Sequence, residues 1–574
     1  MIQIIADNII SGLGGTVSQN LEEIRQGRTA LKPSSLFRVP DGGRVVVSQM
    51  DDGFIAAPLR NRDFTRLEKF MISSALESCK SLGADILKDK STIFVFSTTK
   101  GNIKYLGKDI QRSALWRSAE AVSSFFGNPN RPLTVSNACI SGIAAIIVAK
   151  RLLQARLYKT AVVIGADELT EFVVSGFGSF KALSDEPCRP FDAARRGLNI
   201  GEAVGTVILR RADSADDIFY RDDYLKTPQF ITSGAITNDA NHISGPSRTA
   251  EGLYRAIART LDFEYGLTAE VSSGEAFINP HGTATLYNDQ MESLAISRSG
   301  LSDLDVFPLK GYFGHTLGAS GVIETIISCH FLDEGWLPAA MGYTSEGCSP
   351  APKIISKPRK TDARWFLKTV SGFGGSNAAI KVEKLHDGLS AKSDTQYESV
   401  SIQQAQGKVF SFDCIGDVKE SLNALYRQRE MNYPKFHKMD VLCKAGTIAA
   451  DQLLDSFCQD SRTALVMMNA SSSIAADTEY LTTIAEDNFF PSPSVFVYTL
   501  PSIVIGELSI RYKLYGEGAF FVCRDFDRAM ALDYIRCLFA EGAADRALLC
   551  WIEANSQSCN VRAEVLQFFT KLRV

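Results

Sequence analysis

The sequence lacks the features that mark nucleic-acid-binding and membrane-spanning proteins. Its 61 lysine and arginine residues are offset by 65 aspartate and glutamate residues, so the net charge is −4 and no basic stripe is present to neutralise phosphates. No stretch approaches the roughly 20 consecutive apolar residues that a membrane-spanning helix needs. We therefore expect neither nucleic acid as a partner nor a membrane span.

Two further absences concern the cellular compartment. The N-terminal segment has no basic stretch followed by a long apolar run, so it does not look like a secretion signal. The twelve cysteines are scattered and include no Cys-x-x-Cys pair, which is typical of free thiols in a reducing compartment. These features predict a cytoplasmic protein without a disulfide framework, and we assign it no metal site.

The chain has 574 residues, which is too long for one ordinary hydrophobic core. Short β-branched runs alternate with helical patterns up to about residue 385, and this alternation predicts a layered α/β architecture with buried strands. A second set of such elements begins near Gln229, so we divide this part into residues 1–228 and 229–385. Residues 386–407 are polar and aperiodic, and we predict them to be a linker.

Residues 408–574 look like a partial internal repeat of the first α/β half. Three segments match in order and approximate spacing: 463–468 resembles 92–97, 489–493 resembles 125–129, and 546–553 resembles 160–167. The place where the repeat should carry a cysteine holds Thr499-Leu500-Pro501-Ser502, so we expect this unit to have no catalytic residues. Chance similarity is the alternative explanation, because short strand patterns recur widely.

A candidate nucleophile follows one of the predicted strands. Cys139 comes after Leu133-Thr134-Val135 and opens a helix that is apolar nearly all round, which indicates deep burial. A thiol attacks only as the thiolate, and the amides at a helix N-terminus stabilise an anion and lower the thiol pKa. A buried structural thiol is the alternative, since that is the commonest fate of a free cysteine.

Only six histidines occur in the chain, and two of them stand in glycine-bearing turns. His281 lies in Pro280-His281-Gly282-Thr283 after a predicted strand, and His315 lies in Phe313-Gly314-His315-Thr316 before a predicted helix. Proteins of the α/β class place their working groups in such loops. Taken alone, each histidine could equally cap a turn.

Two other features flank these motifs. Lys310 and Glu324 stand on either side of the His315 turn, where a buried pair could hold the loop and tune the charge of the histidine. A solvated lysine and an unrelated glutamate are the simpler alternative. The glycine cluster at 371–377 could bring a backbone N–H close to a reacting oxygen, or it could be a plain tight turn.

In this order and spacing, the motifs around Cys139, His281 and His315 resemble those of the elongating β-ketoacyl-[acyl-carrier-protein] synthases, which have a Cys-His-His site. The resemblance covers residues 1 to about 385 and includes the segment Gly372-Phe373-Gly374-Gly375. It implies a thiolase-like α/β fold, in which two related halves form five α-β-α-β-α layers. Residues 408–574 would then add a partial thiolase-like α/β domain.

The resemblance also implies roles for the residues at the centre of the site. Cys139 would be the nucleophile that takes the acyl chain from a carrier-protein thioester. His281 and His315 would promote decarboxylation of the malonyl group and stabilise the enolate. Lys310 would be the supporting lysine of the catalytic set, with Glu324 as a further supporting residue.

Further roles that the resemblance implies concern the oxyanion and the substrate arm. Phe373 would be a gate, and its backbone amide would form the oxyanion hole together with that of Cys139. Thr283, Thr285 and Gly374 would bind the substrate, the two threonines by contacting the phosphopantetheine arm. No cofactor is implied beyond the phosphopantetheine that the acyl carrier protein brings.

The implied function is decarboxylating Claisen condensation of an acyl-enzyme with a malonyl-carrier protein, giving a 3-oxoacyl-carrier protein. The implied partners are acyl carrier protein and a second synthase chain, as homodimer or heterodimer. The unit at 408–574 resembles the half-synthases of polyene pigment pathways, which favours a specialised pathway such as aryl polyene or flexirubin-type synthesis.

Two alternatives remain open at this stage. One is a non-catalytic partner or scaffold similar to chain-length factors, which keep the fold and replace the cysteine. The other is a thiolase, which the sequence disfavours because the His315 loop has no second cysteine and the nearest one, Cys329, lies inside a predicted helix.

Overall fold

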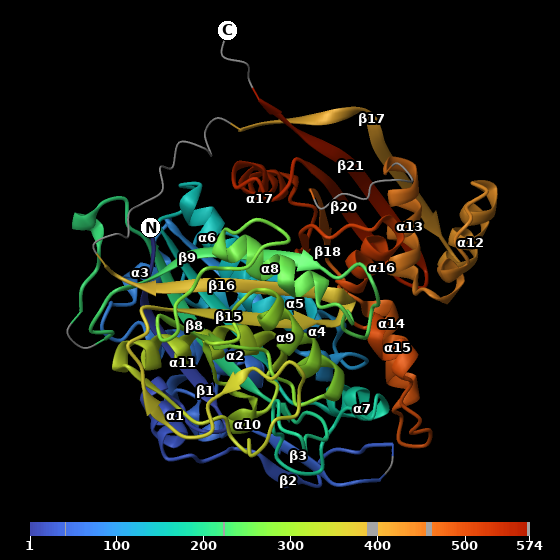
Figure 1. Cartoon of the computed structure of the whole chain (residues 1–574). Helices are drawn as coiled ribbons and strands as arrows, with labels where there is room; N and C mark the ends of the chain where they lie inside the picture. The colour runs from blue at the N-terminus through green and yellow to red at the C-terminus, as the bar shows by residue number, and fades with distance from the viewer. Residues whose placement is uncertain (41, 222–223, 387–399, 455–461, 571–574) are drawn as a thin grey trace.

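A single sixteen-stranded sheet runs through the computed structural model, which describes residues 1–40, 42–221, 224–386, 400–454 and 462–570. The strand order is β13-β11-β10-β15-β16-β9-β1-β8-β6-β4-β5-β19-β18-β20-β21-β17. This order divides into three groups of neighbouring strands that follow one another in the sequence. In Figure 1 the first two groups, blue to yellow, lie beside the orange and red third group.

The first two groups have the same topology. The first consists of β1 (Ile2–Ser11), β4 (Thr92–Ser97), β5 (Leu133–Val135), β6 (Thr160–Asp167) and β8 (Ala203–Arg211), in the spatial order β1-β8-β6-β4-β5. The second consists of β9 (Gln229–Asn238), β10 (Ala276–Asn279), β11 (Asp305–Val306), β15 (Trp365–Gly372) and β16 (Ser376–Lys384), in the order β9-β16-β15-β10-β11. A short further strand, β13 (Lys353–Ile354), lies at its edge beside β11. Corresponding pairs are parallel or antiparallel alike, so the two groups are related halves, as the predicted fold class requires.

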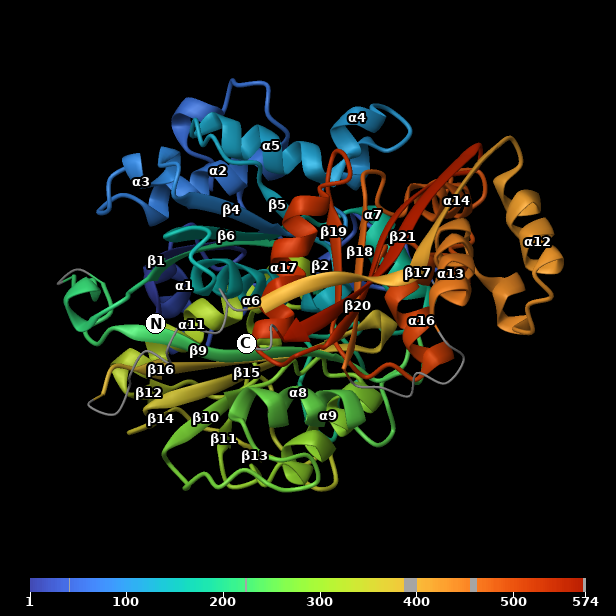
Figure 2. The ribbon, with the colours of Figure 1, turned by 90° about the horizontal axis from the view of Figure 1, so that it is seen from above.

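Helices form three layers around these two sheet halves (Figure 2). The outer layers hold α2 (Arg66–Ser78) with α5 (Leu115–Phe125) on one side, and α8 (Glu251–Leu261) with α9 (Leu286–Arg298) on the other. Between the halves, α6 (Ser141–Gln154) and α11 (Ser320–Glu334) contact both sheets and each other. Every residue of α6 from Ser141 to Leu153 is buried, as its apolar circumference predicts. The five-layered thiolase-like arrangement is therefore confirmed.

The C-terminal group repeats the topology of the first half. It consists of β17 (Val400–Ile415), β18 (Thr463–Asn469), β19 (Gly518–Val522), β20 (Arg546–Ala554) and β21 (Ser558–Thr570), in the order β17-β21-β20-β18-β19. Helices α13 (Val441–Leu453) and α17 (Arg528–Ala540) cover its opposite faces (Figure 2). Strands β18 and β20 take the places of β4 and β6, as the sequence similarity predicts.

Two expectations about the repeat are wrong. Residues 489–493 do not precede the counterpart of β5, because α15 (Pro493–Tyr498) and α16 (Ile503–Tyr512) intervene before β19. The counterpart of Cys139 is not found at 499–502. Val95 of β4 pairs with Leu133 of β5, and its match Val466 of β18 pairs with Ala519 of β19. Leu133 therefore corresponds to Ala519, and Cys139, six residues further on, corresponds to Asp525. Helix α16 packs on α13 and precedes β19, as α5 packs on α2 and precedes β5, so the segment 489–493 lies one helix too early to match 125–129.

The predicted linker also differs from the structure. Strand β17 begins at Val400, inside the range 386–407 that we predicted as linker, while residues 387–399 lie outside the described residues. The polar side chains among residues 400–405 are typical of an edge strand, since β17 is the last strand of the sheet.

The C-terminal unit is joined to the first half by an antiparallel strand contact. The Asn137 side chain donates to Gly518 O at 2.8 Å and accepts from Phe520 N at 2.7 Å, and Ser136 N donates to Phe520 O at 3.0 Å. Strand β19 therefore occupies the free edge of β5, which is an edge where a second copy of the chain would otherwise be able to pair.

A buried charge cluster fixes the same interface. Arg151 of α6 is 1% exposed and forms a two-point contact with Glu517, and its Nε atom donates to Glu541 at 2.8 Å. Tyr534 of α17 also contacts both Arg151 and Glu517. Glu541 has a pKa lowered to about 2, because the nearby charges of Arg151 and Lys150 outweigh its burial.

Among the residues that the structure describes, none of the helices combines the length and the apolar character that a membrane span requires.

The substitution Arg151→Met tests how far this cluster holds the C-terminal unit. It leaves the Glu517 carboxylate buried without its cation, so we expect the free energy of unfolding to fall by about 3–5 kcal/mol. Urea denaturation at pH 7 measures the change. The control Arg25→Met removes an exposed ion pair with Glu334 and should cost less than about 1 kcal/mol. Equal losses in the two variants would contradict the assignment.

Candidate active site

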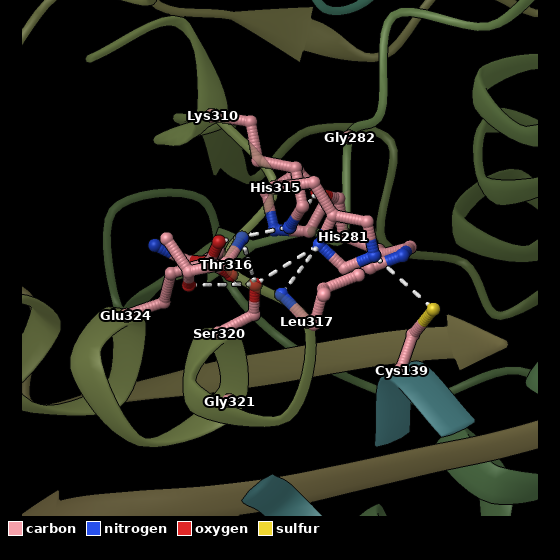
Figure 3. A network of polar contacts seen from close by, with 12 residues as sticks. Cys139, His281, Gly282, Lys310, His315, Thr316, Leu317, Ser320, Gly321 and Glu324 are labelled. Carbon is pink, nitrogen blue, oxygen red and sulfur yellow. Dashed lines mark hydrogen bonds and ion pairs between the residues drawn. The ribbon is translucent and has the colours of Figure 1, made fainter. Parts of the chain in front are cut away.

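Cys139, His281 and His315 converge on one buried point between the two halves of the fold (Figure 3). One ligand atom of each lies within 4.8 Å of the corresponding atoms of the other two. His315 Nε2 is 3.1 Å from Cys139 Sγ, and the two imidazole rings are 5.0 Å apart and nearly perpendicular. The structure therefore brings together the three groups that the sequence places in separate motifs.

The turn after β5 presents the sulfur of Cys139. A short 3-10 turn at Ala138–Ile140 precedes α6, and Ala138 has a φ of +49°, a strained value for a residue with a side chain. On the other side, a Cβ atom on Gly372 would lie 3.1 Å from the backbone nitrogen of Cys139. The strained turn and the absent side chain together let the 371–377 segment reach the nucleophile.

The electrostatics of the thiol differ from the prediction. Burial raises the pKa of Cys139 to about 11, although Lys310 and the backbone N–H of Phe373 act in the opposite direction. The helix N-terminus, on which the expectation from the sequence rests, favours a lower thiol pKa. The cost of placing an anion in this apolar interior outweighs that effect, so the resting residue is a protonated thiol.

His315 is held in one tautomer by its surroundings. Its Nδ1 atom accepts from Leu317 N at 3.3 Å and contacts Ser320 Oγ at 3.1 Å (Figure 3). Ser320 Oγ in turn accepts from Thr316 N, which leaves its proton free to point towards Nδ1. The hydrogen-bond network thus assigns the proton of the neutral ring to Nε2, which faces Cys139 Sγ.

His281 is positioned through its backbone. Glu292 of α9 accepts from the backbone N–H groups of His281 and Gly282, both at 2.6 Å, and Lys310 Nζ donates to His281 O at 2.7 Å. Within the described part of the chain, the Nδ1 atom of His281 has no hydrogen-bond partner. A buried, unpaired ring nitrogen is available to a substrate atom.

Both imidazoles are neutral at physiological pH. Burial lowers the pKa of His281 and of His315 well below the ordinary value, and the positive charges of Lys310 and Lys368 add to the effect. The proximity of His315 lowers the pKa of His281 further. The two rings can therefore act as uncharged hydrogen-bond donors or acceptors.

The remaining predicted residues surround this centre. Lys310 and Glu324 form a fully buried ion pair at 2.8 Å. Of the two possibilities left open by the sequence, the buried pair is therefore the one found, and the solvated lysine is not. Thr283 and Thr285 share a hydroxyl contact at 3.0 Å on the His281 loop. Between them, Ala284 has a φ of +60°, a conformation that favours glycine.

Phe373 contacts the site around Cys139, whereas the neighbouring Gly374 contacts the C-terminal unit. The backbone N–H of Phe373 faces the sulfur of Cys139, and its ring stacks on Phe177 at 5.9 Å. Gly374 donates to Ile243 O and accepts from the Asn238 side chain. Its backbone also lies so close to α16 that a Cβ atom on Gly506 would be 2.6 Å from Gly374 O. Gly374 therefore uses these backbone groups to hold the turn.

A pocket beside Cys139 is lined by both units of the chain. Val173, Phe177, Leu317 and Phe373 come from the first unit, and Phe496 and Leu500 come from α15 and the segment after it. Lys100 borders this pocket and is buried in an ion pair with Asp477 at 2.6 Å, and it also donates to Thr499 O. The segment 499–502, expected to replace a cysteine, thus completes the wall of the pocket.

Sequence reasoning missed Lys368, Phe496 and Asp477. Lys368 stands in the apolar run Trp365-Phe366-Leu367-Lys368-Thr369-Val370, and a charged residue inside such a strand signals a buried partner. The other two lie in a unit whose sequence carries no motif, and nothing local points from them to Cys139.

The comparisons agree with this geometry. Residues 68–215 match the family description "Beta-ketoacyl synthase, N-terminal domain", and residues 230–344 match "Beta-ketoacyl synthase, C-terminal domain". Residues 68–344 therefore carry both domains of the β-ketoacyl synthase family. The Cys-His-His set that these domains hold is intact.

Among its relatives is 3-oxoacyl-[acyl-carrier-protein] synthase 2 of Synechocystis, which is 28% identical over 412 residues, or 65% of this chain and 96% of the relative. The protein of the same name from Coxiella burnetii is 24% identical over 66% of this chain and 97% of its own. A mitochondrial relative from Schizosaccharomyces pombe is 27% identical over 65% of this chain and 97% of its own, so the cytoplasmic location stays a prediction.

Solved structures extend the similarity of the fold to the C-terminal unit. The PfaC keto synthase-chain length factor has a TM-score of 0.75 at 13% identity and covers 100% of this chain and 78% of its own. The ketosynthase ApeO of Xenorhabdus doucetiae, solved with its chain length factor ApeC, has a TM-score of 0.56 at 22% identity. It covers 67% of this chain and 98% of its own. The additional α/β unit of this synthase is therefore shared with the PfaC fold.

The raised thiol pKa predicts how Cys139 reacts with a small electrophile. A thiol with a pKa of about 11 is almost fully protonated at neutral pH. We therefore expect its alkylation by iodoacetamide to keep accelerating up to pH 10. Peptide mass spectrometry can follow Cys139 separately from the other cysteines. A rate that levels off below pH 8 would contradict the effect of burial and would favour the helix N-terminus.

Proposed function

We propose that the chain condenses an acyl group held on Cys139 with malonyl-carrier protein, releasing CO₂ and a 3-oxoacyl-carrier protein. One observation carries the proposal: a cysteine sulfur 3.1 Å from a ring nitrogen of His315, with a second neutral imidazole facing the same point. Thioester carbon-carbon bond formation needs one nucleophile and two uncharged donors in such an arrangement.

The first half-reaction loads the enzyme. Cys139 Sγ attacks the carbonyl carbon of the acyl-carrier thioester, and the backbone N–H groups of Cys139 and Phe373 stabilise the oxyanion. The bond between the carbonyl carbon and the pantetheine sulfur then breaks, and the thiol proton of Cys139 ends on that sulfur. The Nε2–H of His315 stabilises the sulfur of Cys139 while it is negatively charged.

The second half-reaction forms the new bond. The malonyl thioester loses CO₂, and the electron pair of the broken bond forms an enolate whose oxygen accepts hydrogen bonds from His281 and His315. The enolate carbon attacks the acyl carbon on Cys139, the bond between that carbon and the cysteine sulfur breaks, and the departing thiolate takes up one proton from solvent water. Neutral imidazoles suit this step because they stabilise the enolate without a fixed counter-charge.

We propose that the C-terminal unit occupies the position that a separate partner chain takes in two-chain synthases. Three observations support this: β19 covers the edge of β5, Asp525 stands where Cys139 has its counterpart, and Phe496 and Leu500 line the pocket. ApeO and PfaC are each described with a chain length factor. A specialised pathway of the aryl polyene or flexirubin type is the pathway that we propose.

A non-catalytic scaffold is the second candidate, and the observation that favours it applies to residues 408–574 alone. That unit has an aspartate at the nucleophile position and supplies wall residues, as a chain-length factor would. Residues 1–385 keep all three reactive groups in contact, so we assign catalysis to them.

The substitution Cys139→Ala tests the proposed reaction directly. We expect no acyl-enzyme and no 3-oxoacyl product when acyl- and malonyl-carrier protein are supplied together, because the acyl group has no sulfur to occupy. Decarboxylation of malonyl-carrier protein should persist, since it depends on the histidines. Mass spectrometry of the carrier proteins measures both. The control Cys550→Ala removes a buried thiol remote from the site. Product formation by Cys139→Ala would contradict the mechanism.

Leu500→Ala tests the contribution of the C-terminal unit to acyl selection. Shortening this side chain enlarges the pocket beside Cys139, so we expect acyl groups longer by two or more carbons to load faster relative to short ones. Competition between acyl-carrier proteins of different length measures the shift. Leu514→Ala is the matched control, because Leu514 is buried in the same unit and does not line the pocket. An equal shift in both variants would exclude a specific role for Leu500.

A further inference from the structure

Lys368 is a buried charge that the mechanism above does not use. It lies on β15, which faces the histidine loops, and its side chain is fully buried. Its Nζ atom is 2.5 Å from Glu324 Oε2, 2.8 Å from Asn279 Oδ1 and 3.0 Å from Pro280 O. Asn279 and Pro280 directly precede His281, so this ammonium contacts the segment that carries the histidine.

Lys310 and Lys368 bind opposite oxygens of the same carboxylate. Lys310 Nζ contacts Glu324 Oε1 at 2.8 Å, and Lys368 contacts Oε2 of the same group. Two ammonium groups therefore flank one buried carboxylate. These three groups together carry a net charge of +1.

A second buried carboxylate balances this excess charge. Glu292 of α9 is fully buried, accepts from the backbone of His281 and Gly282, and contacts Thr369 Oγ1, next to Lys368, at 3.4 Å. The layer behind the imidazoles thus contains two lysines and two glutamates. Without Lys368 that layer would carry a net charge of −1 directly behind His281.

We propose that Lys368 is a positioning residue for the decarboxylation step, which fixes the Asn279-Pro280 segment and balances the charge of Glu292 behind the two imidazoles. The inference rests on the function proposed above. Loss of this cation would leave an uncompensated buried anion near both rings.

The charged and titratable groups that surround the rings determine the sign of the effect. His281 faces Lys310 and Lys368 from behind, and His315 and Cys139 across the cavity, while Glu292 holds its backbone. Removing one cation stabilises the imidazolium form, which raises the pKa of both histidines. Since the neutral rings do the work, activity should be lost at low pH and retained at high pH.

The test uses the full chain with Lys368→Met, assayed for malonyl-carrier decarboxylation between pH 5 and pH 9. We expect the acid limb of the pH profile to move to higher pH by about one unit or more, so that the loss relative to the unmodified chain is largest at pH 5 and shrinks towards pH 9. Acylation of Cys139, measured separately in a single turnover, should change far less. The matched control is Lys150→Met. It removes a buried lysine of α6 that forms an ion pair with Glu541, and it should leave the pH profile unchanged.

A double variant separates charge balance from packing. Lys368→Met combined with Glu292→Gln restores neutrality, so its acid limb should return towards that of the unmodified chain. An acid limb in Lys368→Met that coincides with that of the unmodified chain would overturn the proposal. A double variant that folds and keeps the displaced limb would also overturn it.

A measurement on the unmodified chain decides the matter if these variants do not fold. Diethylpyrocarbonate reacts with neutral imidazole, so carbethoxylation of His281 should stay constant from pH 7.5 down to pH 5. A rate that falls below pH 6.5, as for an ordinary histidine, would overturn the inference. Because this readout needs no substrate, failure of the proposed reaction and failure of the charge balance give different results.

Discussion

The site depends on the close approach of two helix N-termini. A Cβ atom on Gly142 of α6 would lie 2.9 Å from Gly318 O, and one on Gly321 of α11 would lie 2.6 Å from Ile143 N. Side chains at these positions would force the helices apart and separate His315 from Cys139. Asp167 holds the approach from one side, since it accepts from Gly318 N and from Thr99 N. Catalytic geometry here is a consequence of backbone contact between the halves of the fold.

Close backbone and side-chain contacts also join the C-terminal unit to the first unit, and they occur in two places. At the sheet, β19 continues the strand order beyond β5, and Arg151 brings a buried charge to Glu517 across the junction. At the pocket, Phe496 packs so closely on α7 (Glu171–Ser179) that a Cβ atom on Gly176 would be 2.2 Å from its ring. A single polypeptide therefore joins the pocket wall to the synthase core.

The sequence predicted the chemistry better than its environment. Cys139, His281 and His315 could be found because each stands in a glycine-bearing turn beside a periodic element, and such local signals survive without coordinates. The thiol pKa could not be predicted, because the helix effect is local whereas burial depends on α11 and on the 371–377 turn, which are distant in the sequence. The nucleophile counterpart in the repeat was misplaced because more residues separate β18 from β19 than separate β4 from β5, so the segment before α16 was matched to the segment before β5.

These parts explain why the resting site is uncharged at its centre and charged around it. Burial keeps Cys139 protonated and both imidazoles neutral, while Lys310, Lys368, Glu324 and Glu292 form a balanced layer behind them. A charged thiolate-imidazolium pair would strengthen attack on the first thioester, but an imidazolium would also bind the malonyl carboxylate and oppose the loss of CO₂. A neutral centre avoids this conflict. In the proposed reaction negative charge develops only on the sulfur, on the carbonyl oxygen that the backbone amides stabilise, and on the enolate oxygen that the two imidazoles stabilise.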